Sequence, residues 1–219
     1  MRMMNIRKQL FNVLGMVSLA GLFPACDVLE GAYDSPEVAV QEGQYYIDAT
    51  DYAKWVYINL HTPTPTITTS TINIDDLTET GVPEQWDIAQ HRYDVKTNGA
   101  AVMMTDYHSI EELEAAGLPM GGNWIEDEES EQSVTIDMSH MMEGWLTYAP
   151  GHKNTEIGKW VEVDTSNMPP SYTMHDNVML LRLADGTYAA IQLANFMSTD
   201  SYQIKGWMTV NYKYPMFEK

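Results

Sequence analysis

The sequence predicts an all-β protein, a single antiparallel domain with at most one short helix. Apolar and polar residues alternate in several separate runs, which is the pattern of half-buried strands. Six Trp and thirteen Tyr residues add aromatic side chains that strands favour. Helical periodicity is confined to residues 108–117, where Ser109 is placed to cap a helix and Gly117 to end it.

The alternating runs place the strands in chain order. They cover residues 44–50, 53–60, 85–95, 133–138, 159–163, 177–183, 187–193 and 205–214. Asp185 and Gly186 lie between two of these runs and predict a hairpin with a two-residue turn. Residues 61–73 are rich in Thr and hold two prolines, so they predict a loop or an edge strand. The acidic run 126–131 predicts a solvated loop.

Residues 1–25 have the pattern of a lipoprotein signal peptide. A basic start precedes an apolar run that ends at Phe23 and is too short to span a bilayer permanently. Cys26, the only cysteine, follows at the expected cleavage point and is the predicted site of lipid attachment. The alternative is an ordinary signal peptide followed by a free thiol. Residues 26–44 predict an acidic tether, and the folded domain is expected over residues 45–219.

Charge and cysteine usage argue against several classes of partner and site. The chain has 12 Lys and Arg against 31 Asp and Glu; three of the basic residues lie in residues 1–25, which leaves 9 against 31, a formal charge of −22. Such a field repels nucleic acid and anionic lipid, so we expect no nucleic-acid partner and membrane contact only through the lipid on Cys26. With Cys26 lipidated, no thiol is left for a disulfide, a metal site or a nucleophile.

Catalytic motifs are not apparent in the sequence. It has no GxSxG elbow, no HExxH pair and no glycine-rich phosphate loop, so we expect no enzyme activity. The segment HRYD, residues 91–94, offers His91 and Asp94 for acid–base chemistry. On one continuous strand these two side chains point to opposite faces, so we interpret the segment as scaffold.

Methionine is the residue type that points to a ligand. Four of the sixteen methionines lie in residues 1–25, which leaves twelve in the rest of the chain. Five alternate with apolar neighbours and are expected to pack in the core: Met103, Met104, Met179, Met197 and Met208. Four others lie among glycine, proline and polar residues, where loops at the rim of the sheet are expected: Met141, Met142, Met168 and Met174.

Thioether chemistry narrows the choice of ligand. A thioether is a soft, neutral donor, which suits haem iron or Cu(I) and serves poorly for zinc, calcium or magnesium. Two methionines on opposing loops can bind both axial positions of a haem. Copper sites normally use more sulfur and histidine ligands close in sequence than residues 140–142 supply. The sequence therefore favours haem.

Three segments carry a family resemblance. They are WDIAQHRYDVKTN at residues 86–98, PSYTMHDNVMLLRLADGTYAAIQLANF at residues 170–196 and KGWMTVNYKYP at residues 205–215. They resemble the HmuY family of haem-binding surface lipoproteins, and the likeness runs from about residue 45 to residue 215. It implies that residues 45–219 are a haem-binding β domain whose loops grip iron protoporphyrin IX at one end.

The same resemblance implies a role and a location. Members of this family are haemophores, which take haem from host haem proteins and pass it to a TonB-dependent outer-membrane receptor. By this likeness the protein is expected to be lipid-anchored in the outer membrane and to face the cell exterior. None of these steps is an enzymatic turnover.

The resemblance also indicates where the axial ligands lie. The loop that holds a histidine ligand in other members is matched by GKWVEVDTSNMPPSY, in which Met168 is the only soft donor. The earlier loop is matched by SHMMEGW, from which we expect Met141 as the second ligand, with Met142 and then His140 as alternatives. If that segment is extended, Met141 and Met142 point to opposite faces, and His140 shares a face with Met142.

Two further hypotheses concern charge and an alternative function. Lys153 and Lys159 lie beside the two loops and are candidates to offset the charge of the haem propionates. A surface adhesin or glycan-binding β module without haem chemistry is the alternative function, because an aromatic-rich β lipoprotein can present aromatic platforms to solvent.

Overall fold

The structure, a computed structural model, describes residues 40–217. The predicted signal peptide, the lipid site at Cys26 and most of the predicted tether lie outside these residues. Within residues 40–217, no helix is long and apolar enough to cross a membrane. The fold in this range is all-β with a single α-helix, as the alternating pattern predicts.

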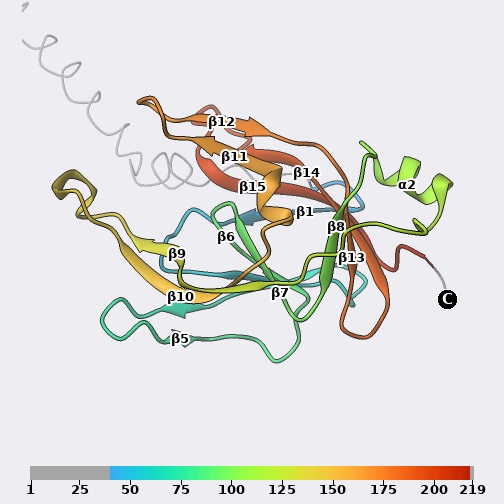
Figure 1. Ribbon diagram of the computed structural model, residues 1–219, viewed down its shortest axis with the longest axis horizontal. Coiled ribbons are helices and arrows are strands. Elements are labelled where there is room, and N and C mark those ends of the chain that lie inside the picture. Colours follow the sequence, from blue (N-terminus) through green and yellow to red (C-terminus); the bar gives the residue numbers. More distant parts are fainter. Residues whose placement is uncertain (1–39, 218–219) are drawn as a thin grey trace, which may run out of the picture. The chain divides into compact units, whose positions relative to one another are not determined.

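A five-stranded antiparallel sheet forms one side of the fold (Figure 1). Its strand order is β1-β15-β14-β13-β8. These strands are β1 Gln44–Asp48, β15 Lys205–Lys213, β14 Tyr188–Met197, β13 Met179–Arg182 and β8 Ala101–Met104. The C-terminal third of the chain therefore supplies the centre of this sheet, because β13, β14 and β15 are successive neighbours.

A four-stranded antiparallel sheet, in the order β3-β2-β6-β7, forms the second side. Its strands are β3 Thr66–Thr69, β2 Val56–Asn59, β6 Ile88–His91 and β7 Asp94–Thr97. The threonine-rich β3 lies at the edge of the sheet and is exposed along its whole length, which confirms the edge strand predicted within residues 61–73. Its prolines precede the strand, where no ladder hydrogen bond is lost.

The main core lies between the two sheets. Ile58 of β2 and Val95 of β7 belong to the same buried cluster as Met179 and Leu181 of β13. Successive side chains of a strand face opposite sides, so Leu180 belongs to a different buried cluster on the other face. Both faces of β13 are thus covered, which explains why its sequence is a continuous apolar run.

Helix α2, Ile110–Ala116, covers the outer face of the five-stranded sheet through Ile110 and Leu113. The Ser109 hydroxyl accepts a hydrogen bond from the Glu112 backbone N–H at 3.1 Å. Gly117 ends the helix with a φ of 80°, a conformation that glycine adopts without steric cost. Both predicted ends of this helix are confirmed.

Three two-stranded hairpins complete the fold. They pair β4 Thr71–Ile72 with β5 Glu79–Thr80, β9 Glu128–Asp137 with β10 Thr147–Lys153, and β11 Val161–Asp164 with β12 Ser171–Met174. The first five residues of β9 are exposed. The prediction of a loop over residues 126–131 is therefore wrong for residues 128–131, because their carboxylates remain solvated while the backbone forms β9 and pairs with β10. Residues 126 and 127 lie outside the strand, as predicted.

The segment HRYD forms a hairpin turn, which contradicts the expected continuous strand. His91 of β6 lies opposite Asp94 of β7, and Arg92 has a φ of 53°. Residues 90–93, Gln-His-Arg-Tyr, contain no glycine or proline, so no strong turn signal marks this turn in the sequence. His91 is buried, and its Nε2 lies 2.7 Å from the Tyr52 carbonyl oxygen, so its role in the structure is that of scaffold.

The hairpin between β13 and β14 is confirmed, but its loop has three residues and not two. The Leu183 N–H donates to the Thr187 carbonyl at 2.9 Å, and the Gly186 N–H donates to the Leu183 carbonyl at 2.9 Å. Gly186 has a φ of 79°, which is the left-handed position of a three-residue hairpin loop.

Candidate functional site

The tip of the β9–β10 hairpin holds the first predicted ligand group. It forms a 3-10 turn, η1 Met141–Glu143. The Glu143 N–H donates to the His140 carbonyl at 2.9 Å, and the Gly144 N–H donates to the Met141 carbonyl at 3.1 Å. Gly144 ends the turn with a φ of 90°. The segment is not extended, so side chains 141 and 142 project about 120° apart and not to opposite faces.

His140 has partners of its own at this tip. Its ring stacks on Trp145, with centroids 3.9 Å apart and planes 11° apart. Its Nδ1 lies 3.0 Å from Oε2 of Glu143. The two contacts hold the ring within the turn and leave Nε2 as its remaining polar atom. His140 is therefore the most constrained of the three candidates.

Met141 and Met142 differ in how far they project from the turn. Met141 is 47% exposed and Met142 is 91% exposed. About half of Met141 is therefore covered by its surroundings, whereas Met142 extends into solvent. This difference favours Met141 as the pre-oriented donor.

The tip of the β11–β12 hairpin carries Met168, which is 80% exposed. The Asp164 carboxylate accepts a hydrogen bond from the Ser166 N–H at 2.8 Å, which starts the turn. Met174 lies at the other end of this hairpin, opposite Val161 in the ladder. Met174 is thus a strand residue, and the expectation that it lies in a rim loop is wrong.

The bases of both hairpins are anchored to the core. Val134 and Ala149 of the β9–β10 hairpin pack with Trp55 and Tyr57 on the outer face of the four-stranded sheet. The helical turn η2 Ile157–Trp160 leads into β11. Trp160 is buried there, and its indole N–H donates to the Tyr93 carbonyl at 2.9 Å. Each hairpin is a separate two-stranded sheet. The β11–β12 hairpin is also held near its tip, because Tyr172 packs against Tyr93 and Phe196 of the main core.

Both hairpin tips lie at the same end of the domain. Figure 1 shows the ends of β9–β10 and β11–β12 together at the left of the view, with β11–β12 above. Several exposed large apolar side chains lie on these hairpins. They are Met141, Met142, Trp145, Tyr148, Val163, Met168 and Met174. Exposed apolar side chains at one end of a domain are candidates for contact with a partner or ligand.

The remaining methionines lie where the alternating pattern predicts. Met103, Met179 and Met208 are buried. Met104 and Met197 are partly buried and pack against the main core. The division of methionines into core and loop groups is thus confirmed for these five.

The two predicted propionate partners are already paired. Lys153 Nζ lies 3.1 Å from Oδ1 of Asp94, and Lys159 Nζ lies 2.5 Å from Oε2 of Glu156. Sequence reasoning missed Lys205, whose Nζ lies 4.6 Å from the ring centroid of Tyr172 on β12. Lys205 forms no ion pair with another residue in the described range. It comes from β15, distant in the sequence, so no local motif could have indicated it.

The described residues contain no group of three or more His, Cys, Asp or Glu side chains that could hold a metal ion. The candidate donors at the two hairpin tips are the thioether sulfur atoms of Met141, Met142 and Met168 and the imidazole of His140. The sulfur atoms are neutral and need no deprotonation to bind a soft metal centre.

Comparison with known proteins agrees with this architecture. The sequence pattern of the family described as HmuY protein matches residues 51–212. The chain belongs to the HmuY family. Comparison with curated protein sequences gives no match.

Two solved structures of Bacteroides proteins share this family's fold with substantial identity. A protein of Bacteroides fragilis NCTC 9343, named a lipoprotein, is 44% identical, with a TM-score of 0.71; 80% of this chain and 90% of that chain are covered. A protein of Bacteroides vulgatus ATCC 8482, named an HmuY-like haem-binding protein, is 43% identical, with a TM-score of 0.69; 80% of this chain and 92% of that chain are covered.

A more distant solved structure shows the same fold. Apo PinO of Porphyromonas gingivitis is 24% identical to this chain, with a TM-score of 0.61, and the match covers 80% of this chain and 97% of the PinO chain. The strand arrangement therefore persists at low sequence identity.

Proposed function

We propose that this protein is a haem-binding surface lipoprotein, with Met141 and Met168 as the axial ligands of iron protoporphyrin IX. The observation that carries the proposal is the cluster of exposed apolar side chains on two hairpins, with a thioether at each tip. A relative that is 43% identical is named for haem binding, which supports the same ligand here.

The residues at this end of the domain fit such a ligand. Bound haem supplies an iron with two axial positions and a broad apolar macrocycle. Met141 and Met168 project from separate hairpins and are sufficiently exposed to reach a ligand held between the tips. Trp145 and Val163 offer apolar surface that the macrocycle would remove from water. Lys205, which has no carboxylate partner in the described range, is a candidate for the propionates.

Binding and release, and not turnover, are the proposed function. Each hairpin is a separate two-stranded sheet, and we expect the loop at its tip to move without disturbing the core. In this proposal the protein takes haem from host haem proteins and passes it to a TonB-dependent outer-membrane receptor. A lipid on Cys26 anchors it in the outer membrane on the exterior side. The naming of the 44% identical relative as a lipoprotein supports this anchor.

A haem titration followed by absorption spectroscopy tests the proposal. We expect the wild-type protein to give a sharp, shifted Soret band at one haem per chain. Met168→Ala should lose the six-coordinate spectrum and bind haem at least about tenfold more weakly, the equivalent of about 1.4 kcal/mol. Met120→Ala is the matched control, because Met120 is likewise an exposed methionine but lies outside both hairpins.

Two results would contradict the proposal. Failure of the wild-type protein to shift the haem spectrum would remove the function itself. A Met168→Ala spectrum identical to that of the wild type would remove the ligand assignment and leave haem binding to other donors.

A further inference from the structure

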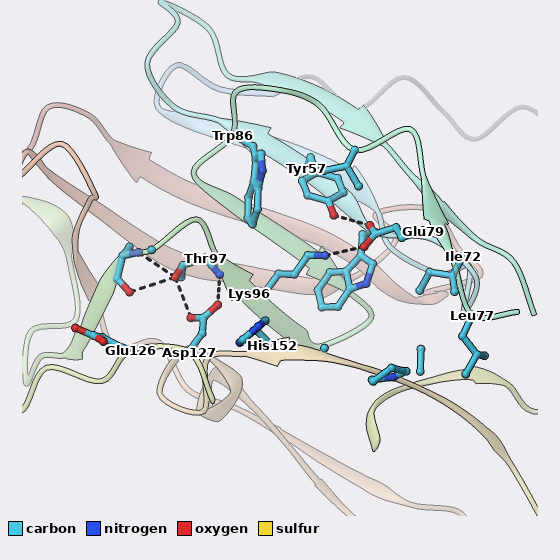
Figure 2. A pocket seen from close by; sticks show the side chains of 17 residues that line it. Tyr57, Ile72, Leu77, Glu79, Trp86, Lys96, Thr97, Glu126, Asp127 and His152 are labelled. Carbon is cyan, nitrogen blue, oxygen red and sulfur yellow. Dashed lines mark hydrogen bonds and ion pairs between the residues drawn. The ribbon is translucent and has the colours of Figure 1, made fainter. Parts of the chain in front are cut away.

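A cavity of about 630 Å³ lies beside the outer face of the four-stranded sheet (Figure 2). Its walls come from β2, from the hairpin β4–β5, from β7 and from the basal part of β10. Residues 149–152 of β10 line it, but no residue of the β9–β10 tip does. The cavity is therefore separate from the hairpin tips that carry Met141 and Met168. Its volume is in the range of small-molecule sites.

One wall of the cavity is aromatic and holds a lysine of the chain itself. Lys96 Nζ lies 4.3 Å from the ring centroid of Trp55, 4.9 Å from that of Tyr57 and 5.8 Å from that of Trp86. The same ammonium lies 3.0 Å from Oε2 of Glu79. The position where a cationic ligand would contact all three rings is thus occupied by Lys96.

Of the other polar side chains that line the cavity, some are already hydrogen-bonded within the protein and others are free to bond a ligand. Asp127 accepts hydrogen bonds from the Thr97 N–H at 2.6 Å, the Thr97 hydroxyl at 2.9 Å and the Asn154 amide at 3.1 Å, so its carboxylate is used by the fold. Glu126 and His152 are exposed, and neither side chain has a hydrogen bond or ion pair with another described residue. Figure 2 shows His152 across the cavity from Trp86, with Lys96 between them.

This arrangement selects against charged and purely apolar ligands. Anions are repelled because Glu79, Glu126 and Asp127 outnumber Lys96 among the lining side chains. A cation would have to displace the Lys96 ammonium from the aromatic rings and break its ion pair with Glu79. An apolar ligand would remove water from Glu126 and His152 and give them no hydrogen-bond partner in return. An uncharged ligand that has both an apolar face and hydroxyl groups satisfies all three conditions.

We propose that this cavity binds a neutral sugar. The apolar C–H face of a sugar ring packs on the partly exposed indole of Trp86, and its hydroxyl groups bond to Glu126 and His152. Leu77 and Val82, exposed at the rim, cover the edge of the ring. The site does not depend on the haem proposal, because none of its residues lies at either hairpin tip.

Isothermal titration of the purified protein with named sugars tests this assignment. The neutral probes are lactose, maltose, N-acetylglucosamine and methyl α-mannoside; spermidine and N-acetylneuraminic acid are the charged probes. We expect saturable binding of at least one neutral sugar and of neither charged probe. Absence of binding by all four neutral sugars, or binding of a charged probe alone, would overturn the proposal.

Substitutions locate the binding and separate it from the haem site. Glu126→Gln and Trp86→Ala should each weaken sugar binding at least about tenfold, and Glu111→Gln on α2 is the matched control with an exposed carboxylate. If Trp86→Ala does not fold by circular dichroism, Glu126→Gln decides alone. Unchanged sugar binding in Glu126→Gln would contradict the site. Met168→Ala should keep sugar binding, and Glu126→Gln should keep the haem spectrum, so either proposal can fail without the other.

Discussion

Methionine lies in opposite surroundings in two regions of this protein. In the five-stranded sheet, Met179 and Met208 are fully buried between β layers. At the hairpin tips, Met141 and Met168 are exposed beside glycine, proline and polar residues. In the first region a flexible apolar side chain fills core space. In the second region no core needs filling, so we propose that the thioether itself is the property that the haem site uses.

The largest effect is expected from truncating a buried methionine. Met179→Ala removes a side chain from the core between the sheets and should lower the free energy of unfolding by about 2–5 kcal/mol. Denaturant unfolding measures this loss. The haem spectrum of the folded variant should remain that of the wild type. A changed spectrum would mean that the core region also controls the ligands.

Substitutions within the β9–β10 tip sharpen the comparison. Met141→Ala should weaken haem binding at least about tenfold, or about 1.4 kcal/mol, while the free energy of unfolding stays within about 0.5 kcal/mol. Met142→Ala, at the more exposed neighbour, should change neither property. Haem titration and denaturant unfolding of both variants test this. Loss of haem binding in Met142→Ala with retention in Met141→Ala would reverse the assignment.

The oxidation state of iron should alter the affinity for haem through the methionines at the hairpin tips and not through those in the core. Neutral thioether ligands favour ferrous over ferric iron. We expect haem to bind several-fold more tightly with dithionite present than in air, and this difference should disappear in Met168→Ala. Competition with a haem-binding apoprotein of known affinity, run in both redox states, measures it. Equal affinities in the wild type would argue against two thioether ligands.

A smaller effect should come from pH acting on the four-stranded sheet. Burial lowers the pKa of His91 below its ordinary value of about 6.5, although the hydrogen bond to the Tyr52 carbonyl opposes this. The unfolded chain therefore binds a proton more readily than the folded one. Stability is fully present above pH 6.5 and falls as the pH drops through 6.5 toward the folded pKa. Denaturant midpoints of His91→Gln should lose that part of the pH dependence.

Much of the fold could be predicted from the sequence because its signals are local. Alternation marked most strands, and Ser109 and Gly117 marked both ends of α2. The turn at Arg92 was missed, because the sequence there has neither glycine nor proline to signal a turn. The strand character of residues 128–131 was also missed, since solvated carboxylates on an exposed hairpin have the composition of a loop.

The candidate site was only partly predictable for a different reason. Met168 and the methionine pair at residues 141–142 stand out by composition, and the structure describes each at a hairpin tip. Which of the pair faces a ligand depends on the 3-10 turn, which the sequence does not mark. Lys205 and the cavity around Lys96 are assembled from segments far apart in the chain, so no spacing rule could bring them together.

Iron K-edge X-ray absorption of the ferrous haem complex tests the central claim most directly. Sulfur and nitrogen neighbours of iron are distinguished in such spectra by their bond lengths. The account predicts two sulfur neighbours in the wild-type complex, one in Met168→Ala and none in the double variant Met141→Ala/Met168→Ala. A wild-type complex whose iron has only nitrogen or oxygen neighbours would contradict it.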